Sequence, residues 1–183
     1  MCDFGSVVFL SLVWRVGKRE RKDKNVFKIV RTEALTDAIY LMDVEAPRVA
    51  KNCLPGQFVI VRGSEDGERI PLTICDYSRE AGTITIVFQV VGAATEMMKN
   101  LKVGDSFTDF VGPLGRPSEL VEEDLETLKN KKILFVAGGV GTAPVYPQVK
   151  WLHEHGVAAD VIIGGRSKEL IILEEQMKAV AGN

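Results

Sequence analysis

The sequence is poor in the residues that build metal centres and redox-active thiol pairs. Its 183 residues include three cysteines and two histidines, and no two cysteines form a CxxC pair. Ligands of a structural zinc ion or an iron–sulfur cluster are usually grouped at short, fixed spacings. We therefore expect reduced thiols in a cytoplasmic protein, and no metal or iron–sulfur site made by this chain.

An excess of basic residues is also absent. The chain has 23 Lys and Arg against 25 Asp and Glu, a net charge of -2. Proteins that bind nucleic acids normally carry a basic excess or a basic patch, so this class is disfavoured. With 46% hydrophobic and 26% charged residues, the composition is that of an ordinary globular protein rather than a disordered one.

A hydrophobic run long enough to cross a membrane is missing as well. The apolar stretch VVFLSLVW covers only residues 7–14, whereas a membrane-spanning helix needs about 20 residues. A basic run follows this stretch, while a signal peptide carries its positive charge before the apolar core. Residues 1–24 are predicted to form an extra strand or a poorly ordered leader. A contact with a membrane surface or a partner protein is the alternative.

Residues 25–118 consist of short segments rich in Val, Ile, Thr and Phe, several of them separated by turn residues. Six such segments at this spacing predict antiparallel strands, arranged as a barrel of the Greek-key type or as a sandwich. One helix is expected within this part, over Thr95–Leu101.

Residues 131–183 follow a different pattern. The segments KKILFVAG and VAADVIIGG predict parallel strands buried on both faces, and a helical segment follows each of them. The order β-α-β-α is the opening of a Rossmann-like nucleotide-binding domain, joined to the first part through residues 119–130. Because two strands make only a small sheet, we expect a truncated domain, either a fragment or a short gene product.

The loop AGGVGTAP between the first of these strands and its helix is a candidate phosphate site. Gly138, Gly139 and Gly141 would let backbone N–H groups face a phosphate near Thr142, and a helix N-terminus adds partial positive charge. Pro144 suits the first turn of a helix. The loop lacks the third spaced glycine of GxGxxG, so a tight strand-to-helix turn remains the alternative.

A second candidate is the stretch Gly92-Ala93-Ala94-Thr95, which follows a predicted strand. Gly92 permits a close approach of the backbone to a ligand. Thr95 can either cap the helix or offer its hydroxyl to a phosphate oxygen, and both possibilities remain open.

The stretch ERIPLTI supplies a third candidate. Pro71 within a strand indicates a sheet edge or a bulge. Leu72 and Thr73 could present an apolar surface and a hydroxyl to a flat ring, and Arg69 could neutralise a phosphate. Alone, the stretch favours an edge strand that carries a solvated arginine.

The order of these stretches, together with PGQF at residues 55–58 and the segment GPLGRPS, resembles the ferredoxin–NADP reductase family. In that family an arginine–x–aromatic-or-aliphatic–serine/threonine motif holds the flavin, and a glycine–x–x–serine/threonine motif holds its pyrophosphate. A glycine-rich loop ending in alanine–proline opens the nucleotide domain. The resemblance runs from about Val26 to the end of the chain. It is greatest to small flavoprotein subunits of the sulfide dehydrogenase beta and NADH-dependent reduced ferredoxin–NADP oxidoreductase alpha type.

This resemblance implies a function and a set of site residues. The protein would pass electrons between NAD(H) or NADP(H) and an iron–sulfur partner through FAD. The residues expected at FAD are Arg69, Pro71, Leu72, Thr73, Ile74, Gly92, Ala93, Ala94 and Thr95, with Thr73 donating a hydrogen bond to the reactive flavin nitrogen. The residues expected at the nicotinamide nucleotide are Gly138, Gly139, Gly141, Thr142 and Arg166.

The sequence departs from the family pattern at two points. Ile70 stands where the family motif has its arginine, and Arg69 is displaced by one position. Members of this kind also continue to a cysteine-rich loop that holds a [2Fe-2S] cluster, for which this chain has no ligands. The resemblance therefore implies a hetero-oligomer with a larger iron–sulfur and flavin subunit, or a ferredoxin, as electron partner.

Several alternatives stay open at this point. One is the electron-transfer subunit of a dihydroorotate dehydrogenase, and another is a non-catalytic module that only binds a nucleotide or a partner. Arg166 could meet the 2′-phosphate of NADP, but the choice between NAD and NADP is not determined.

Overall fold

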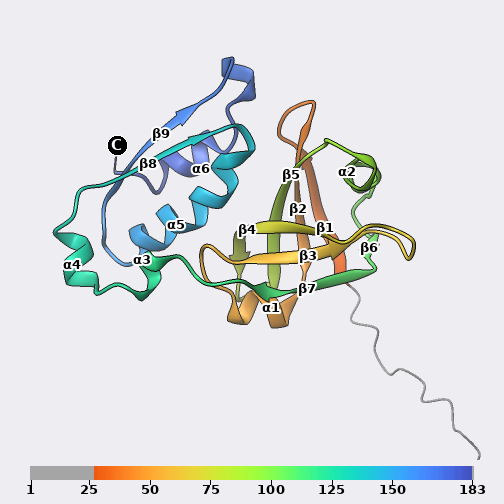
Figure 1. Cartoon of the computed structure of the whole chain (residues 1–183), viewed down its shortest axis with the longest axis horizontal. Helices are drawn as coiled ribbons and strands as arrows, with labels where there is room; N and C mark the ends of the chain where they lie inside the picture. The colour runs from red at the N-terminus through yellow and green to blue at the C-terminus, as the bar shows by residue number, and fades with distance from the viewer. Residues whose placement is uncertain (1–26, 183) are drawn as a thin grey trace, which may run out of the picture.

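The computed structural model describes residues 27–182 and shows a β-barrel beside a smaller α/β part (Figure 1). The barrel contains strands β1–β7 with helices α1 and α2, and the α/β part contains β8 and β9 with helices α3–α6. The predicted class, an antiparallel barrel followed by a Rossmann-like α/β unit, is confirmed. The predicted leader, residues 1–24, lies outside the described residues.

The barrel is an antiparallel sheet with strand order β6-β1-β2-β5-β4-β3-β7. Its strands are β1 Phe27–Ala34, β2 Ile39–Glu45, β3 Phe58–Arg62, β4 Ile70–Ser78, β5 Thr83–Gln89, β6 Ser106–Phe107 and β7 Asp109–Leu114. The sequence predicted six strands; the seventh arises because the run DSFTDFV divides at Thr108. β6 then pairs with β1 and β7 with β3, so that consecutive segments of the chain nearly close the barrel.

The barrel core is made by alternate residues of the strands, as expected when successive side chains point to opposite faces. Its buried members include Ile29, Met42, Val44, Val59, Val61, Ile74, Ile84, Ile86 and Phe88. Helices α1 (Pro47–Asn52) and α2 (Ala93–Lys99) pack against this core near opposite ends of the barrel strands (Figure 1). α2 begins two residues before the predicted start, with Gly92 as its N-cap.

The α/β part is built on two parallel strands, β8 and β9, paired from Ile133↔Ala159 to Gly138↔Gly164. Its elements are α3 Glu119–Glu122, α4 Leu125–Lys129, β8 Ile133–Gly138, η1 Gly139–Gly141, α5 Thr142–Glu154, β9 Ala159–Gly164, η2 Lys168–Leu170 and α6 Glu174–Lys178. The single helix predicted after β9 is wrong. A 3-10 turn, η2, precedes the short helix α6, and Leu173 between them has a positive φ of 57°.

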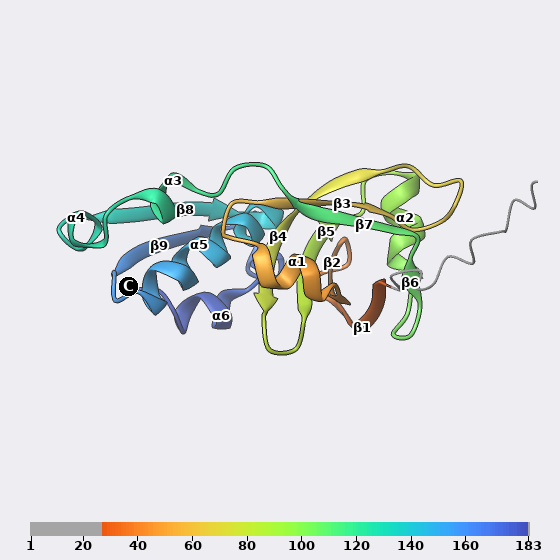
Figure 2. The same cartoon turned by 90° about the horizontal axis from the view of Figure 1, so that it is seen from below.

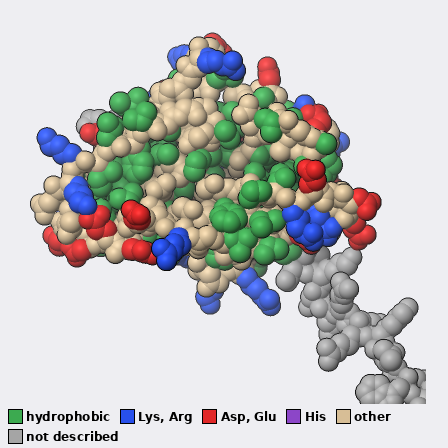
Figure 3. Space-filling view, in the orientation of Figure 1, with side chains coloured by type: hydrophobic (Ala, Val, Ile, Leu, Met, Phe, Trp, Pro, Cys, Tyr) green, Lys and Arg blue, Asp and Glu red, His purple; other side chains and the backbone are tan. Residues whose placement is uncertain are grey.

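One face of the β8–β9 sheet is exposed. α5 and α6 cover the other face, as Figure 2 shows. Leu134, Val136 and Ile162 are 57%, 70% and 55% exposed on the uncovered side. Hydrophobic side chains gather over this region in the space-filling view (Figure 3). The prediction of strands buried on both faces is therefore wrong for the described part of the sheet.

A second apolar cluster joins the barrel to the α/β part. It contains Ile39, Leu41, Cys75 and Val87 from the barrel and Ala143, Ile172 and Leu173 from the α/β part. Because Ala143 lies in the first turn of α5, this cluster holds the N-terminal end of α5 against the outer side of the barrel. Within residues 27–182, no helix is both long and apolar enough to cross a membrane.

Gly56 provides a test of how closely the barrel and the following segment approach. Its φ is +91°, and a Cβ atom there would lie 2.6 Å from the backbone nitrogen of Ser118. We expect Gly56→Ala to lower the free energy of unfolding by roughly 3 kcal/mol, because a strained backbone and a contact with backbone atoms add together. Urea denaturation measures this loss.

Gly104→Ala is the matched control. Gly104 has a φ of +100°, but its added Cβ would meet nothing within 4 Å. In this variant the free energy of unfolding should fall only by the cost of backbone strain, about 1–2 kcal/mol. Equal losses in the two variants would show that the approach of Ser118 adds no cost.

Candidate functional site

At least one residue from each of the three sequence-predicted stretches lines the same cavity, although Gly92, Ala93 and Ala94 do not line it. This cavity of about 420 Å³ is lined by Pro71–Thr73 from β4, Thr95 from α2, and Gly141 and Pro144 from the start of α5. Its volume lies in the range of small-molecule sites, about 300–1,000 Å³. Residues far apart in sequence therefore contribute to a single site.

The cavity lies where β4 changes from one partner strand to another. Residues 70–73 pair with β3, whereas pairing with β5 begins at Ile74. Over Ile70–Thr73 the side of β4 away from β3 is thus unpaired, which suits Pro71 because proline has no N–H to donate. Pro71 marks a local edge, as predicted, within a strand that lies in the interior of the sheet.

Alternation along β4 determines which side chains face the barrel. Ile74 is buried in the barrel core, and Ile70 and Leu72 pack against the same core. Pro71 and Thr73 consequently lie on the opposite side of the strand. Leu72 does line the cavity, but its side chain also belongs to the periphery of the core.

The two threonines of the site differ in how their hydroxyls are used. Thr95 is 8% exposed, and its Oγ1 accepts from the N–H groups of Val91 and Gly92, at 3.0 and 3.1 Å. It also donates to the carbonyl oxygen of Gly92, at 2.9 Å. The geometry therefore supports helix capping for Thr95. Thr73 is half-buried, and among the described residues its hydroxyl has no hydrogen-bond partner.

The stretch around Gly92 leaves open space at the start of α2. Gly92 has extended backbone, with a φ of -168°, and a Cβ atom added there would meet nothing within 4 Å. Ala93 is exposed and Ala94 half-buried. A ligand can therefore approach the backbone at this end of α2 without displacing protein atoms.

A second cavity, of about 460 Å³, lies at the carboxyl ends of the parallel strands. It is lined by Gly138, Gly139, Gly164, Gly165 and Arg166 among others. Ligands of open α/β sheets bind at this end of the strands. Gly139 has a positive φ of 54°, a conformation that favours glycine.

The two cavities adjoin one another. Gln89, at the end of β5, and Val140, within η1, line both of them. Two ligands bound in the two cavities would therefore be neighbours.

Two of the predicted residues turn their side chains away from both cavities. Ile74 is 1% exposed in the barrel core, and its N–H donates to the carbonyl oxygen of Gln57 at 3.1 Å. Thr142 is fully buried at the start of α5, and within the described residues its Oγ1 has no hydrogen-bond partner. Neither side chain lines a cavity.

Arg69 lies outside the cavities as well. Its Nη2 is 2.7 Å from Asp109 Oδ2, and Arg62 Nε is 2.7 Å from the same oxygen. The close guanidinium group of Arg62, together with that of Arg69, lowers the pKa of Asp109 below its usual value. The arginine that stands one position from the family motif thus binds a carboxylate of β7 in this structure.

Several lining residues were missed at the level of sequence, among them Val91, Gln89 and Val140. Val91 is 79% exposed beside the cavity, Gln89 ends β5, and Val140 stands between two glycines. The one sequence signal that could have identified Val91 is its position directly before Gly92. Nothing in the sequence distinguished Gln89.

The site offers binding groups rather than acid–base groups. Burial, with a smaller contribution from Asp76, raises the pKa of Cys75 to about 12, and burial raises that of Tyr146 to about 12. Neither group ionises near neutral pH. Residues 27–182 contain no cluster of three or more His, Cys, Asp or Glu side chains able to hold a metal ion. The arrangement can bind and orient flat, partly anionic ligands.

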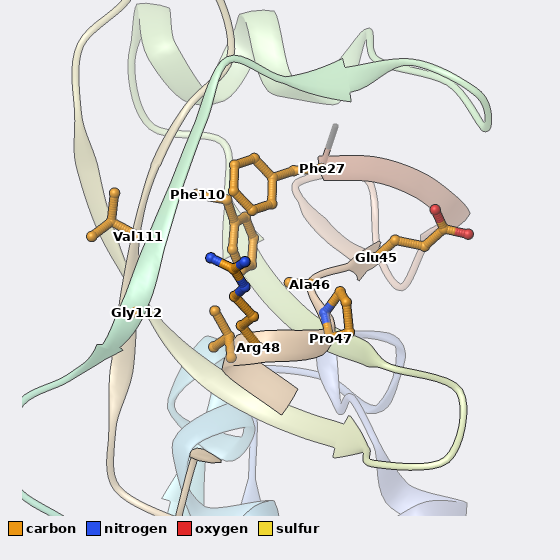
Figure 4. Close-up of a pocket in the computed structure, with 9 residues that line it drawn as sticks. Phe27, Glu45, Ala46, Pro47, Arg48, Phe110, Val111 and Gly112 are labelled. Atoms are coloured by element: carbon orange, nitrogen blue, oxygen red, sulfur yellow. The ribbon is translucent and has the colours of Figure 1, made fainter. Parts of the chain in front are cut away.

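A further cavity, of about 530 Å³, lies elsewhere on the barrel (Figure 4). Phe27, Phe110 and Arg48 are among its lining residues, and the Arg48 side chain extends toward Phe110. None of the sequence-predicted residues lines this cavity. Convergence of motifs, and not cavity volume, therefore identifies the candidate site.

No family model matches the chain, but individual proteins do. An uncharacterised protein in the adh 3′ region of Clostridium beijerinckii is 60% identical over 86% of this chain and 53% of its own length. A homologue of the electron transfer subunit of dihydroorotate dehydrogenase B (NAD(+)) from Thermotoga maritima is 38% identical over 84% of this chain and 52% of its own. The chain spans about half the length of the curated relatives it matches.

Solved structures share the same architecture. The NADH-dependent reduced ferredoxin–NADP oxidoreductase structure superposes with a TM-score of 0.77 at 37% identity, over 87% of this chain and 55% of that one. Ferredoxin–NADP+ reductase from Plasmodium falciparum superposes with a TM-score of 0.65 at 16% identity, over 84% and 64%. At that identity the second likeness shows the fold alone.

The different use of the two hydroxyls predicts different stabilities for two conservative variants. Thr95→Val leaves the N–H groups of Val91 and Gly92 without their acceptor and should lower the free energy of unfolding by about 1–2 kcal/mol. Thr73→Val removes a hydroxyl with no partner in the described chain and should change it by less than about 0.5 kcal/mol. Urea denaturation of the two purified variants and the wild type compares them. Equal losses would contradict the assignment of Thr95 as the structural hydroxyl.

Proposed function

This chain belongs to the ferredoxin–NADP reductase-like family, and we propose that it acts within a flavoprotein that passes electrons between NAD(H) or NADP(H) and an iron–sulfur partner. The convergence of the predicted stretches on one cavity, with a nucleotide-type cavity adjoining it, carries this proposal. The name of the Thermotoga relative and the NADH-dependent oxidoreductase support it.

FAD is the cofactor that the first cavity fits. The unpaired side of Pro71–Thr73 offers a flat surface beside a free hydroxyl, and Val87 and Val91 add apolar area. The open space at Gly92 suits the approach of a pyrophosphate to the N–H groups of the first turn of α2. Bound there, FAD would supply the ability to accept a hydride and release electrons singly. Thr73 would orient the ring through its hydroxyl.

The second cavity suits a nicotinamide nucleotide. Gly138 and Gly139 line this cavity just before α5, and a Cβ atom added at Gly139 would meet nothing within 4 Å. The nearby N-terminus of α5 favours negative charge. Arg166 adds a positive side chain to this cavity. Because Gln89 and Val140 line both cavities, the two ligands would adjoin, as hydride transfer over about 3–3.5 Å requires.

The electron partner is proposed to be a larger iron–sulfur and flavin subunit, or a ferredoxin. Relatives named as electron transfer subunits support an assembly of different subunits. The same names favour a second candidate, the electron-transfer subunit of a dihydroorotate dehydrogenase, which identification of the co-purifying partner would distinguish. Residues 25–118 would form the FAD-binding barrel, 119–130 the connector and 131–183 the nucleotide part. A cytoplasmic location stays a prediction.

A pair of variants tests the assignment of the two cavities. We expect the purified chain to show a flavin absorption spectrum. Gly92→Val should abolish this spectrum in a folded protein, because the added side chain would occupy the open space through which the pyrophosphate approaches the backbone. Arg166→Ala, which removes a positive side chain that lines the second cavity and not the first, should retain FAD and weaken the binding of NADH or NADPH in calorimetric titrations. A colourless wild-type protein, or full FAD occupancy in Gly92→Val, would contradict the proposed flavin site.

Thr73→Val tests the hydroxyl at the ring. The variant keeps the shape of the side chain and removes one hydrogen bond, so FAD affinity should fall by about 1 kcal/mol, roughly fivefold. Fluorescence titration of the flavin-free protein measures this change, together with the reduction potential. If affinity and potential both equal those of the wild type, Thr73 does not contact the ring.

A further inference from the structure

β4 contains an irregularity beyond the cofactor-facing residues. Its pairing with β5 shifts register between Ile74 and Asp76. Ile74 is buried in the barrel core, and Tyr77 packs against that same core. The two residues between them, Cys75 and Asp76, consequently both face outward. Bulges of this kind redirect side chains and are frequent beside functional sites.

Both outward-facing residues contact the α/β part. Cys75 is buried in the apolar cluster that contains Ala143 of α5. Asp76 Oδ1 lies 2.7 Å from Lys150 Nζ, also on α5, and each of these side chains is 28% exposed. The same oxygen accepts from the N–H of Tyr77 at 2.8 Å, which fixes the rotamer of the carboxylate. The register shift thus supplies an apolar contact and an ion pair to one helix.

The ion pair is built on the same two rigid elements that carry the predicted ligand contacts. Asp76 is three residues along β4 from Thr73, about 10 Å at the rise of a strand. Lys150 is eight residues along α5 from Thr142, about 12 Å at the rise of a helix. Because the Asp76–Lys150 contact lies about 10 Å along β4 from Thr73 and about 12 Å along α5 from Thr142, it can restrain the angle between these two elements.

The apolar contact alone does not fix that angle. Burial of apolar surface is non-directional, so α5 could rotate about its contacts at Ala143 and Tyr146 while that cluster stays buried. A half-buried ion pair farther along the helix restrains this rotation. The pair is therefore placed where it can orient the glycine-rich loop relative to β4.

We propose that Asp76 and Lys150 form a positioning pair that aligns the glycine-rich loop of α5 with the cofactor-facing stretch of β4. The alignment of a nucleotide with the flavin rests on the proposed function. The orientation of α5 against the barrel does not, since it follows from contacts within the chain.

A distance measurement between spin labels tests the orientation without any ligand. Labels are attached to cysteines introduced at the exposed positions Lys51 and Lys132, with Cys2→Ser as background. Cys53 and Cys75 are buried, and burial raises their pKa values to about 11 and about 12, which keeps these thiols unreactive.

We expect Asp76→Asn and Lys150→Met each to broaden the distance distribution, and the double variant to broaden it no further. Lys178→Met is the control, because Lys178 pairs with Glu174 and Glu175 inside α6, and it should leave the distribution unchanged. Unchanged distributions in the single variants, broadening in the control, or additive broadening in the double variant would overturn the proposal.

A kinetic measurement then separates this proposal from the proposed function. If the chain binds FAD, the limiting rate of flavin reduction by NADH or NADPH should fall about 10–10²-fold in both single variants, since small misplacements cost this much. FAD content and reduction by dithionite should stay at wild-type levels. Equal limiting rates in variants and wild type would overturn the functional half of the proposal. Absence of flavin from every protein would overturn the proposed function, while the distance measurement still decides the role of the pair.

Discussion

The apolar cluster that joins the outer side of the barrel to the first turn of α5 is the contact on which both cavities depend. Cys75 and Val87 come from the barrel, and Ala143 and Leu173 from the α/β part. Burial of these side chains brings the N-terminal end of α5 beside Ile70–Thr73, the part of β4 that is not paired with β5. Without this contact, the glycine-rich loop would face solvent instead of Pro71–Thr73.

Polar groups in the site divide into those that hold the fold and those that remain available. Thr95 uses its hydroxyl to cap α2, and Arg69 is paired with Asp109. Thr73 and Arg166 have no such partner within residues 27–182. Predicted site residues thus have different roles. The Thr95 hydroxyl lies next to backbone N–H groups and bonds them, whereas the Thr73 hydroxyl lies on the part of β4 that is not paired with β5 and bonds no such group among the described residues.

The β8–β9 sheet illustrates the limit of a hydrophobic pattern. A continuous apolar run predicts a strand, and β8 and β9 lie where the sequence placed them. Whether the run is buried on both faces depends on what packs above and below it. In this structure Leu134, Val136 and Ile162 have no cover on one side, which the pattern of a single strand cannot reveal.

The sequence by itself determined the strand-rich first part, the βα repeat of the second, and the glycine-rich loop, because these follow from local periodicity and backbone freedom. It also identified Gly92 and Pro71 as special positions through the chemistry of glycine and proline. Only the tertiary structure decided that Thr95 caps a helix, that Arg69 binds Asp109, and that Gln89 lines both cavities. The Arg69–Asp109 contact depends on the pairing of β3 with both β4 and β7, and the position of Gln89 between the cavities depends on the docking of α5. These long-range contacts leave no signal in the spacing of neighbouring residues. The choice between the two uses of the Thr95 hydroxyl depends on the burial of this side chain.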